Sequence, residues 1–259
     1  MLVGWTVLCL LAALAWAVTV RQAAGMGTGP GTMGMSLSLF LVLWILMMAA
    51  MMFPSVAPMA ILWTRTVTAR STGARRAGRM TLFLSGYLVA WAGYGLLAYA
   101  ALIGGERLVE ASPTGATWLG AGLVAAAGIY QLTPLKNVCL RHCRSPIGSM
   151  FHYAGFREPL RDLKVGLHHG AYCVGCCWGL MVVLVVVGVM NIAVMAALSV
   201  VIAIEKLWRR GPGFARVVGI VLISFAVLSL FFPALLPGLH RGPASPAMSG
   251  PGSMQMEKS

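Results

Sequence analysis

Five of the six cysteines lie in two short segments, where their spacing could support thiol chemistry. They are Cys139 and Cys143 in the first segment, and Cys173, Cys176 and Cys177 in the second. Three histidines lie among them, His142, His168 and His169. Thiolate and imidazole are the ligands that soft metal ions such as Cu(I) and Zn(II) prefer, and paired thiols can also exchange electrons. The two segments therefore indicate a soft-metal site or a redox site.

Helical spacing separates the histidines. At about 100° per residue, one face of a helix carries His169 together with the three cysteines of the second segment, whereas His168 points away. The cysteines of the first segment are four residues apart and would share a helical face, and Pro134 favours a break just before them. A single buried cysteine often behaves as a small hydrophobe, but five in two clusters favour a shared site. The candidate ligands are therefore these five cysteines with His169 and His142.

A methionine-rich run, MMAAMMFPSVAPM, begins at Met47. Its methionines cover about 140° of a helix, and Pro54 and Pro58 would free backbone carbonyls, as in a broken helix that lines a cavity. Thioethers bind Cu(I) and are almost inert towards zinc, so Met48 and Met52 as ligands would favour copper. Methionine is also an ordinary filler of irregular cores, and that interpretation stays open.

Several polar residues near the cysteines are further candidates. Glu205 stands beside Lys206 at the end of an apolar stretch, where it would be a metal ligand, a proton acceptor or half of an interfacial pair with that lysine. Tyr130, Gln131 and Lys136 flank the first cysteine segment. Packing, or contact with lipid headgroups, is the expected role of each.

Composition places these residues in a membrane protein. The chain has 259 residues, of which 59% are hydrophobic and only 10% charged, far more apolar surface than one soluble core of this size would bury. The net charge of +13 is confined to segments between apolar stretches, without the interleaved aromatics of a nucleic-acid surface. We therefore predict an all-α polytopic transmembrane bundle whose partner is the lipid bilayer, and no nucleic acid.

The apolar stretches predict the membrane topology. They cover residues 2–20, 37–63, 80–103, 117–132, 172–204 and 214–236. The positive-inside rule requires two crossings within 172–204, with a turn near Gly188 to Asn191. The result is seven spans with a short sixth helix, the N-terminus inside and the C-terminus outside. Cleavage of the first span, or one long helix over 172–204, would leave six.

Four parts of the chain follow from this topology. Residues 1–20 form a first span or signal anchor, residues 21–35 an extracytoplasmic loop rich in Gly and Met, and residues 36–236 a metal-binding helical domain. A tail over 237–259 is expected to be disordered. Both cysteine clusters fall at the cytoplasmic boundary, where the cytosol keeps thiols reduced and a structural disulfide is disfavoured.

Three segments carry a resemblance to a known family: YQLTPLKNVCLRHCRSP from Tyr130, GLHHGAYCVGCCWGLM from Gly166, and GVMN followed by IEKL. With the methionine run they resemble a bacterial family of uncharacterised, predicted metal-binding integral membrane proteins, over roughly residues 40 to 207. The resemblance implies a multi-pass protein of the bacterial cytoplasmic (inner) membrane, with the five clustered cysteines as metal-binding thiols. It implies no reaction.

We expect a protein that binds a soft metal ion, copper ahead of zinc, and handles, transfers or transports it at the plasma membrane. A membrane thiol/disulfide or metal-dependent oxidoreductase is the alternative, so enzymatic activity stays open. An assembly subunit is another, with a second membrane metalloprotein or a further copy of the chain as its partner. The sequence has no P-loop, so nucleotide-driven pumping has no support in it. Its single aspartate, Asp162, argues against an aspartyl-phosphate mechanism.

Overall fold

The computed structural model of the chain describes residues 2–24, 32, 34–66, 73–153, 155, 160–232 and 235–236. The regular elements in this part of the chain are all α-helices, which confirms the predicted fold class. They are α1 (Leu2–Ala24), α2 (Leu37–Thr66), α3 (Gly73–Ala111), α4 (Pro113–Leu132), α5 (Pro134–Arg144), α6 (Pro146–Tyr153), α7 (Arg161–Val187), α8 (Ile192–Leu207) and α9 (Gly211–Phe231). The predictions for the tail and for most of the Gly/Met loop lie outside the described residues.

Five of these helices, α1, α2, α3, α7 and α9, are long and apolar enough to cross a membrane. The pair α4 and α5, bent by 66° at their junction, would make a sixth span. The predicted sixth span is α8, whose 16 residues extend about 24 Å, less than a hydrocarbon core of about 30 Å. The structure therefore supports five or six spans, in a chain consistent with a multi-pass membrane protein, and α8 is the short helix that the sequence predicted.

The break between α7 and α8 falls where charge and turn residues predicted it. Gly188 follows the last residue of α7 with a φ of 117°, a conformation that favours glycine because other residues would strain there. Asn191 then caps α8, because its side-chain oxygen accepts a hydrogen bond from the backbone N–H of Val194 at 3.2 Å. The long apolar stretch is thus two helices joined by a tight turn.

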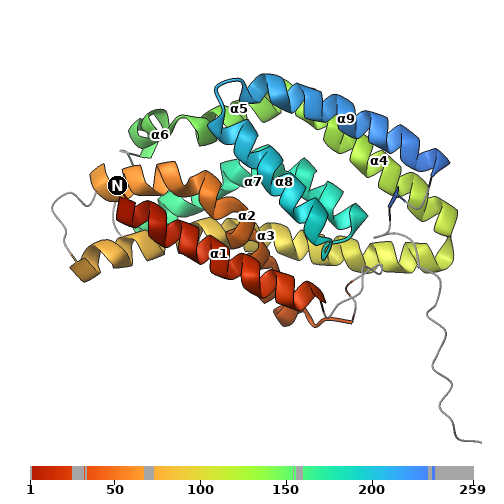
Figure 1. Ribbon diagram of the computed structural model, residues 1–259, viewed down its shortest axis with the longest axis horizontal. Coiled ribbons are helices and arrows are strands. Elements are labelled where there is room, and N and C mark those ends of the chain that lie inside the picture. The colour runs from red at the N-terminus through yellow and green to blue at the C-terminus, as the bar shows by residue number, and fades with distance from the viewer. Residues whose placement is uncertain are drawn as a thin grey trace, which may run out of the picture.

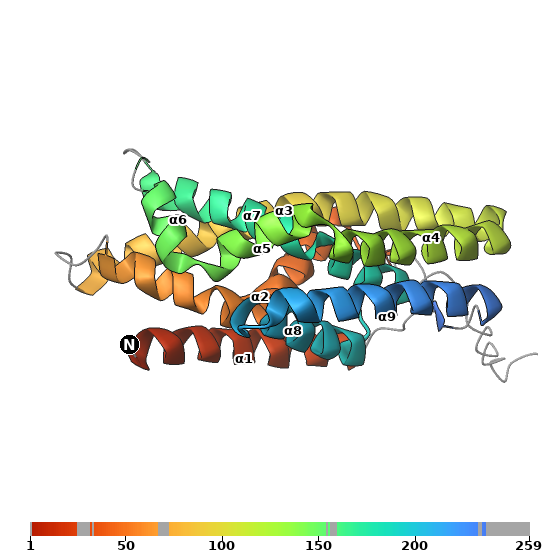
Figure 2. The ribbon, with the colours of Figure 1, turned by 90° about the horizontal axis from the view of Figure 1, so that it is seen from above.

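The helices lie lengthwise beside one another, as Figures 1 and 2 show. The end of the molecule that carries the N-terminus also carries α6 and the start of α7. Helix α7 packs most extensively on α3, and the two backbones touch at Gly86 and Gly166. A Cβ atom on Gly166 would collide with the carbonyl oxygen of Phe83, so glycine at this position permits the close approach. Helix α4 packs in the same way along α9, and α1 along α2.

Asp162 anchors the first turn of α7. Its carboxylate accepts hydrogen bonds from Arg79 Nε on α3 and from Trp63 Nε1 on α2, each at 2.8 Å. A buried carboxylate with a cationic partner and an aromatic N–H is held in one geometry. The single aspartate of the chain therefore fixes α7, the helix that carries three cysteines, against α2 and α3.

Candidate metal centre

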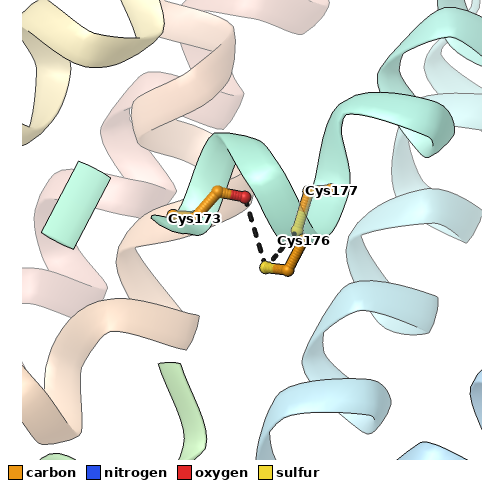
Figure 3. Close-up of side chains that lie close together, drawn as sticks. All are labelled: Cys173, Cys176 and Cys177. Carbon is orange, nitrogen blue, oxygen red and sulfur yellow. Dashed lines mark hydrogen bonds between the residues drawn. The ribbon is translucent and has the colours of Figure 1, made fainter. Parts of the chain in front are cut away.

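Cys173, Cys176 and Cys177 form a compact buried group on α7, which we call the thiol group. Spacings of three and four residues put them on one helical face, and each side chain is only about 1% exposed. Among the described residues, these three form the group of Cys, His, Asp or Glu side chains whose ligand atoms all lie within 4.8 Å of one another. The sulfurs of Cys176 and Cys177 are 3.3 Å apart, and Figure 3 draws this contact as a dashed line.

The first cysteine segment approaches this group through one of its two thiols. Cys143, near the end of α5, places its sulfur 3.8 Å from the sulfur of Cys176. Cys139, one turn earlier, lies over Gly175, where an added Cβ atom would be 3.0 Å from its sulfur. The predicted approach of the two clusters is therefore confirmed for Cys143. The sixth cysteine, Cys9, is exposed on α1.

Two polar side chains contact the sulfur of Cys173. The ammonium of Lys206, on α8, lies 3.0 Å from it, and the hydroxyl of Tyr87, on α3, lies 2.9 Å from it. Both side chains are buried. A cation and a hydroxyl at hydrogen-bond distance favour the ionised form of a thiol, which is the form that binds metals. Of the three thiols, Cys173 is thus the one best placed to be a thiolate.

The methionine run lies inside the protein, on the side of α2 that faces the core. Met48 and Met52 are both fully buried, and the Met52 sulfur is 4.0 Å from the ammonium of Lys206. Helix α2 continues through Pro54 and Pro58 as one element, so the predicted broken helix does not occur. Met52 thus borders the thiol group through the lysine, and Met48 is part of the surrounding core.

The two predicted histidine ligands lie beside the thiol group, towards the end of the bundle that carries α6. His169 is buried on α7, and its Nδ1 atom is 3.4 Å from the hydroxyl of Tyr153. His142, on α5, contacts the same hydroxyl through Nε2 at 2.6 Å. Burial, more than the nearby Cys143 and Tyr172, raises the pKa of Tyr153 well above its usual value, so the hydroxyl keeps its proton. One neutral hydroxyl therefore links both imidazoles.

Glu205 lies in a separate network with Lys136 and Gln131. Its carboxylate accepts hydrogen bonds from Lys136 Nζ at 2.6 Å and Gln131 Nε2 at 3.1 Å, and Lys136 Nζ also contacts the Gln131 carbonyl oxygen. The predicted interfacial pair of Glu205 with Lys206 is therefore wrong, since the partner is a lysine from α5. Contact of Lys136 with lipid headgroups is wrong too, because its side chain is buried in this pair.

Tyr130 packs, as expected, against the helix of the cysteines. Its hydroxyl donates to the carbonyl oxygen of Gly175 on α7 at 2.6 Å, and its ring lies against Trp178 with centroids 4.9 Å apart. Arg144 is the last residue of α5, and its guanidinium donates to the carbonyl oxygens of Glu205 and Arg209. The Tyr130 contacts thus hold the end of α4 against α7, and the Arg144 contacts hold α5, which carries Cys143, against the end of α8.

The donor set fits a soft, low-charge cation better than a hard one. Three thiols converge, with a fourth close by, and no carboxylate joins them among the described residues. Sulfur ligands select Cu(I) or Zn(II), whereas magnesium and calcium need oxygen ligands. A buried cation beside the sulfurs offsets the surplus negative charge that several thiolates leave around a monovalent ion. Within that choice, the nearby thioether of Met52 favours Cu(I).

Sequence reasoning missed the contribution of Lys206 and Tyr87 to this centre. In the sequence, Lys206 is a charged residue at the end of a strongly apolar helix, and its position next to Glu205 favours a pair of the two side chains over a contact with sulfur. Nothing in the sequence indicates that Tyr87 contacts a cysteine, since a tyrosine in an apolar span is most simply an interfacial or packing residue. Its contact depends on the close approach of α3 and α7 at their glycines.

Comparison with known proteins identifies the family to which the chain belongs. The comparisons with curated proteins and with solved structures gave no match. A family model described as a copper chaperone, PpoB2, matches residues 41–229, a range that holds the five clustered cysteines, the methionine run and Lys206. The expectation of a metal-binding family is in keeping with that description, which names copper and gives no specific support to zinc. The chain thus belongs to the PpoB2 copper chaperone family.

Proposed function

We propose that this protein is a copper chaperone of the bacterial cytoplasmic membrane, which holds Cu(I) at the thiol group and passes it to a metalloprotein partner. The observation that carries the proposal is the convergence of three buried thiols on α7, with Cys143 at 3.8 Å, in a chain of a copper chaperone family. The five or six helices able to span a membrane, together with the resemblance to bacterial integral membrane proteins, support the location.

Charge supports Cu(I) as the cargo. Cu(I) held by two thiolates carries a net charge of −1, and a third thiolate makes it −2, which is costly to bury. Lys206 lies 3.0 Å from the Cys173 sulfur and provides one positive charge at that place. Cys173 and its two neighbours on α7 are therefore the principal ligands in this proposal, and Lys206 balances their charge.

Cys143 supports transfer as well as storage. It is half-buried on α5, whereas the thiol group is almost completely buried. A thiol at the margin of a buried site can take the metal from a neighbouring sulfur by exchanging one ligand at a time, without releasing free Cu(I). Cys139 and Glu205 are not ligands in this proposal, because their side chains lie against Gly175 and Lys136 respectively.

Metal content of cysteine variants tests the proposal. The full chain, purified in detergent under reducing, oxygen-free conditions, is given Cu(I), washed against a competing Cu(I) chelator and analysed for copper per chain. Wild-type protein should retain copper, whereas Cys173→Ser and Cys177→Ser should lose at least nine-tenths of it, since each removes a converging sulfur. Cys143→Ser should bind copper but transfer it more slowly to the chelator.

Two matched serine variants control for nonspecific effects of losing a thiol. Cys9→Ser removes an exposed cysteine on α1, and Cys139→Ser removes the thiol that lies over Gly175. Both should retain wild-type copper. Absence of bound copper in the wild-type protein, or equal retention in all five variants, would contradict the proposal. Reversible pairing of the α7 thiols without copper would instead favour the thiol/disulfide alternative.

A further inference from the structure

Three histidines that contribute nothing to the thiol group lie together at the end of the bundle that carries α6. They come from three helices, His142 from α5, His152 from α6 and His168 from α7, and we call them the imidazole cluster. Their ring centroids are 4.9 Å apart for His152 and His168, and 5.9 Å apart for the two pairs that include His142. The chain has five histidines in all, so this gathering accounts for most of its imidazole.

Exposure decreases from this cluster towards the thiol group. His152 is exposed, His142 and His168 are half-buried, and His169 is only 3% exposed. The thiol group, at about 1%, is the innermost part. Nitrogen and sulfur ligands are thus arranged in order from the surface to the interior, and Figure 2 shows α6 beside the start of α7 at the end of the molecule where the order begins.

His142 connects the imidazole cluster to the thiol group. His142 is followed in the chain by Cys143, whose sulfur is 3.8 Å from that of Cys176. His142 and His169 share the hydroxyl of Tyr153, at 2.6 Å and 3.4 Å. The Tyr153 hydroxyl therefore lies between the outer His142 and the buried His169, and the residue after His142 stands at the edge of the thiol group.

We propose that the imidazole cluster is a second copper site, through which Cu(I) reaches or leaves the thiol group. This inference rests on the proposed function. Neutral imidazoles bind Cu(I) but place no negative charge beside it, so the cluster would hold the ion more weakly than thiolates do. A weak outer site beside a strong inner one speeds exchange. Each step replaces one imidazole nitrogen with one sulfur, and the copper stays Cu(I).

The nearness of His152 to solvent permits the small rearrangement that binding requires. The rings of His152 and His168 are stacked, with 23° between their planes, so their nitrogens do not converge on one point. An exposed side chain changes rotamer in nanoseconds or less. Rotation of His152 about its side-chain bonds can therefore bring its ring nitrogen to an ion held by His168 or His142 without disturbing the buried core.

Stopped-flow transfer of Cu(I) to an excess of bicinchoninate, which colours on binding Cu(I), tests the inference. The full chain in detergent is loaded with Cu(I), and His152→Gln/His168→Gln is compared with wild type. Transfer from the double variant should be at least tenfold slower, while the copper retained at the thiol group is unchanged. His240→Gln, at the fifth histidine, is the control and should transfer at the wild-type rate. Equal rates in the double variant and wild type would overturn the inference.

A second measurement separates this inference from the proposed function. The variant Cys173→Ser/Cys176→Ser/Cys177→Ser lacks the thiol group, so any Cu(I) it binds should show nitrogen neighbours in X-ray absorption. Adding His152→Gln and His168→Gln should abolish that signal. Persistence of the signal after the histidine changes contradicts the second site. If wild-type protein instead binds copper through nitrogen alone, the imidazole cluster stands and the proposed thiol site fails.

Discussion

Two buried lysines in this protein have opposite kinds of partner. Lys136 lies 2.6 Å from the carboxylate of Glu205 and contacts Gln131, so its charge meets a full negative charge. Lys206 follows Glu205 directly in the chain, yet it lies 3.0 Å from the sulfur of Cys173 and 4.0 Å from that of Met52. Glu205 and Lys206, consecutive residues of α8, thus belong to two networks. The first is an ion pair, and the second, the sulfur network, joins a lysine to two sulfur atoms.

The different partners of the two lysines suggest different roles, one in the stability of the fold and one in metal binding. A carboxylate and an ammonium neutralise each other whatever the metal content, so the Lys136 pair belongs to the folded scaffold. A thiol carries charge only when it is ionised, and bound Cu(I) keeps it ionised. The cation of Lys206 is therefore matched best when copper is present. The first lysine should matter for stability, and the second for copper affinity.

The largest expected effect comes from breaking the permanent pair. Lys136→Met leaves the Glu205 carboxylate buried without its cation, which should reduce the free energy of unfolding by about 3 kcal/mol. For a chain of this size, that corresponds to a melting temperature lower by roughly 10 °C. Thermal unfolding of the copper-free protein in detergent, followed by circular dichroism, measures the change.

The control for this prediction removes both charges. In Lys136→Met/Glu205→Leu no ion stays buried, and a well-packed apolar pair is often as stable as the ion pair it replaces. The double variant should therefore recover most of the lost stability. A Lys136→Met protein as stable as wild type would show that the pair is not part of the scaffold.

The contrast between the lysines also marks what could be predicted from the sequence. Hydropathy and the positive-inside rule predicted the helical bundle and the turn at Gly188, because both depend on properties that accumulate along many residues. Helical spacing put His169 on the face of the α7 cysteines, and that face is buried. These are local regularities of a single helix, so no knowledge of neighbouring helices was needed.

Partners across helices could not be predicted in the same way. Glu205 beside Lys206 looked like a pair because the two are adjacent, but successive residues of a helix point about 100° apart and face different neighbours. Which helix lies opposite each depends on close packing such as that at Gly166. For the same reason, the sequence could not show that Cys143 and Cys139 have different neighbours. Cys143 has its sulfur near that of Cys176.

An intermediate effect is expected from the lysine at the sulfur network. Lys206→Met keeps the length of the side chain but removes the cation from Cys173, and a hydrogen bond to a charged group contributes roughly 1.5–3 kcal/mol. Affinity for Cu(I) should therefore fall between about tenfold and a hundredfold, as measured by competition with a Cu(I) chelator of known affinity. The melting temperature of the copper-free variant should fall less than that of Lys136→Met.

Retaining the charge checks the cause. Lys206→Arg keeps a cation beside the thiol group, so its affinity for Cu(I) should lie nearer to wild type than that of Lys206→Met. If the two variants lose affinity equally, Lys206 acts through its shape and packing. The conclusion that its charge supports copper binding is then wrong. If Lys206→Met binds Cu(I) as wild type does, charge balance has no part in the site.

The smallest expected effect concerns the neutral partner of the same sulfur. Tyr87→Phe removes the hydroxyl 2.9 Å from the Cys173 sulfur and leaves Lys206 in place. A neutral hydrogen bond contributes about 1 kcal/mol, so affinity for Cu(I) should fall roughly fivefold.

Tyr94→Phe is the matched control, because it removes a hydroxyl that joins the same two helices by donating to the Trp178 carbonyl oxygen at 3.0 Å. Tyr94→Phe should bind copper as wild type does. Equal losses in both variants would mean that each tyrosine acts by holding α3 against α7, whereas a loss confined to Tyr87→Phe would extend the sulfur network of Lys206 to a fourth helix.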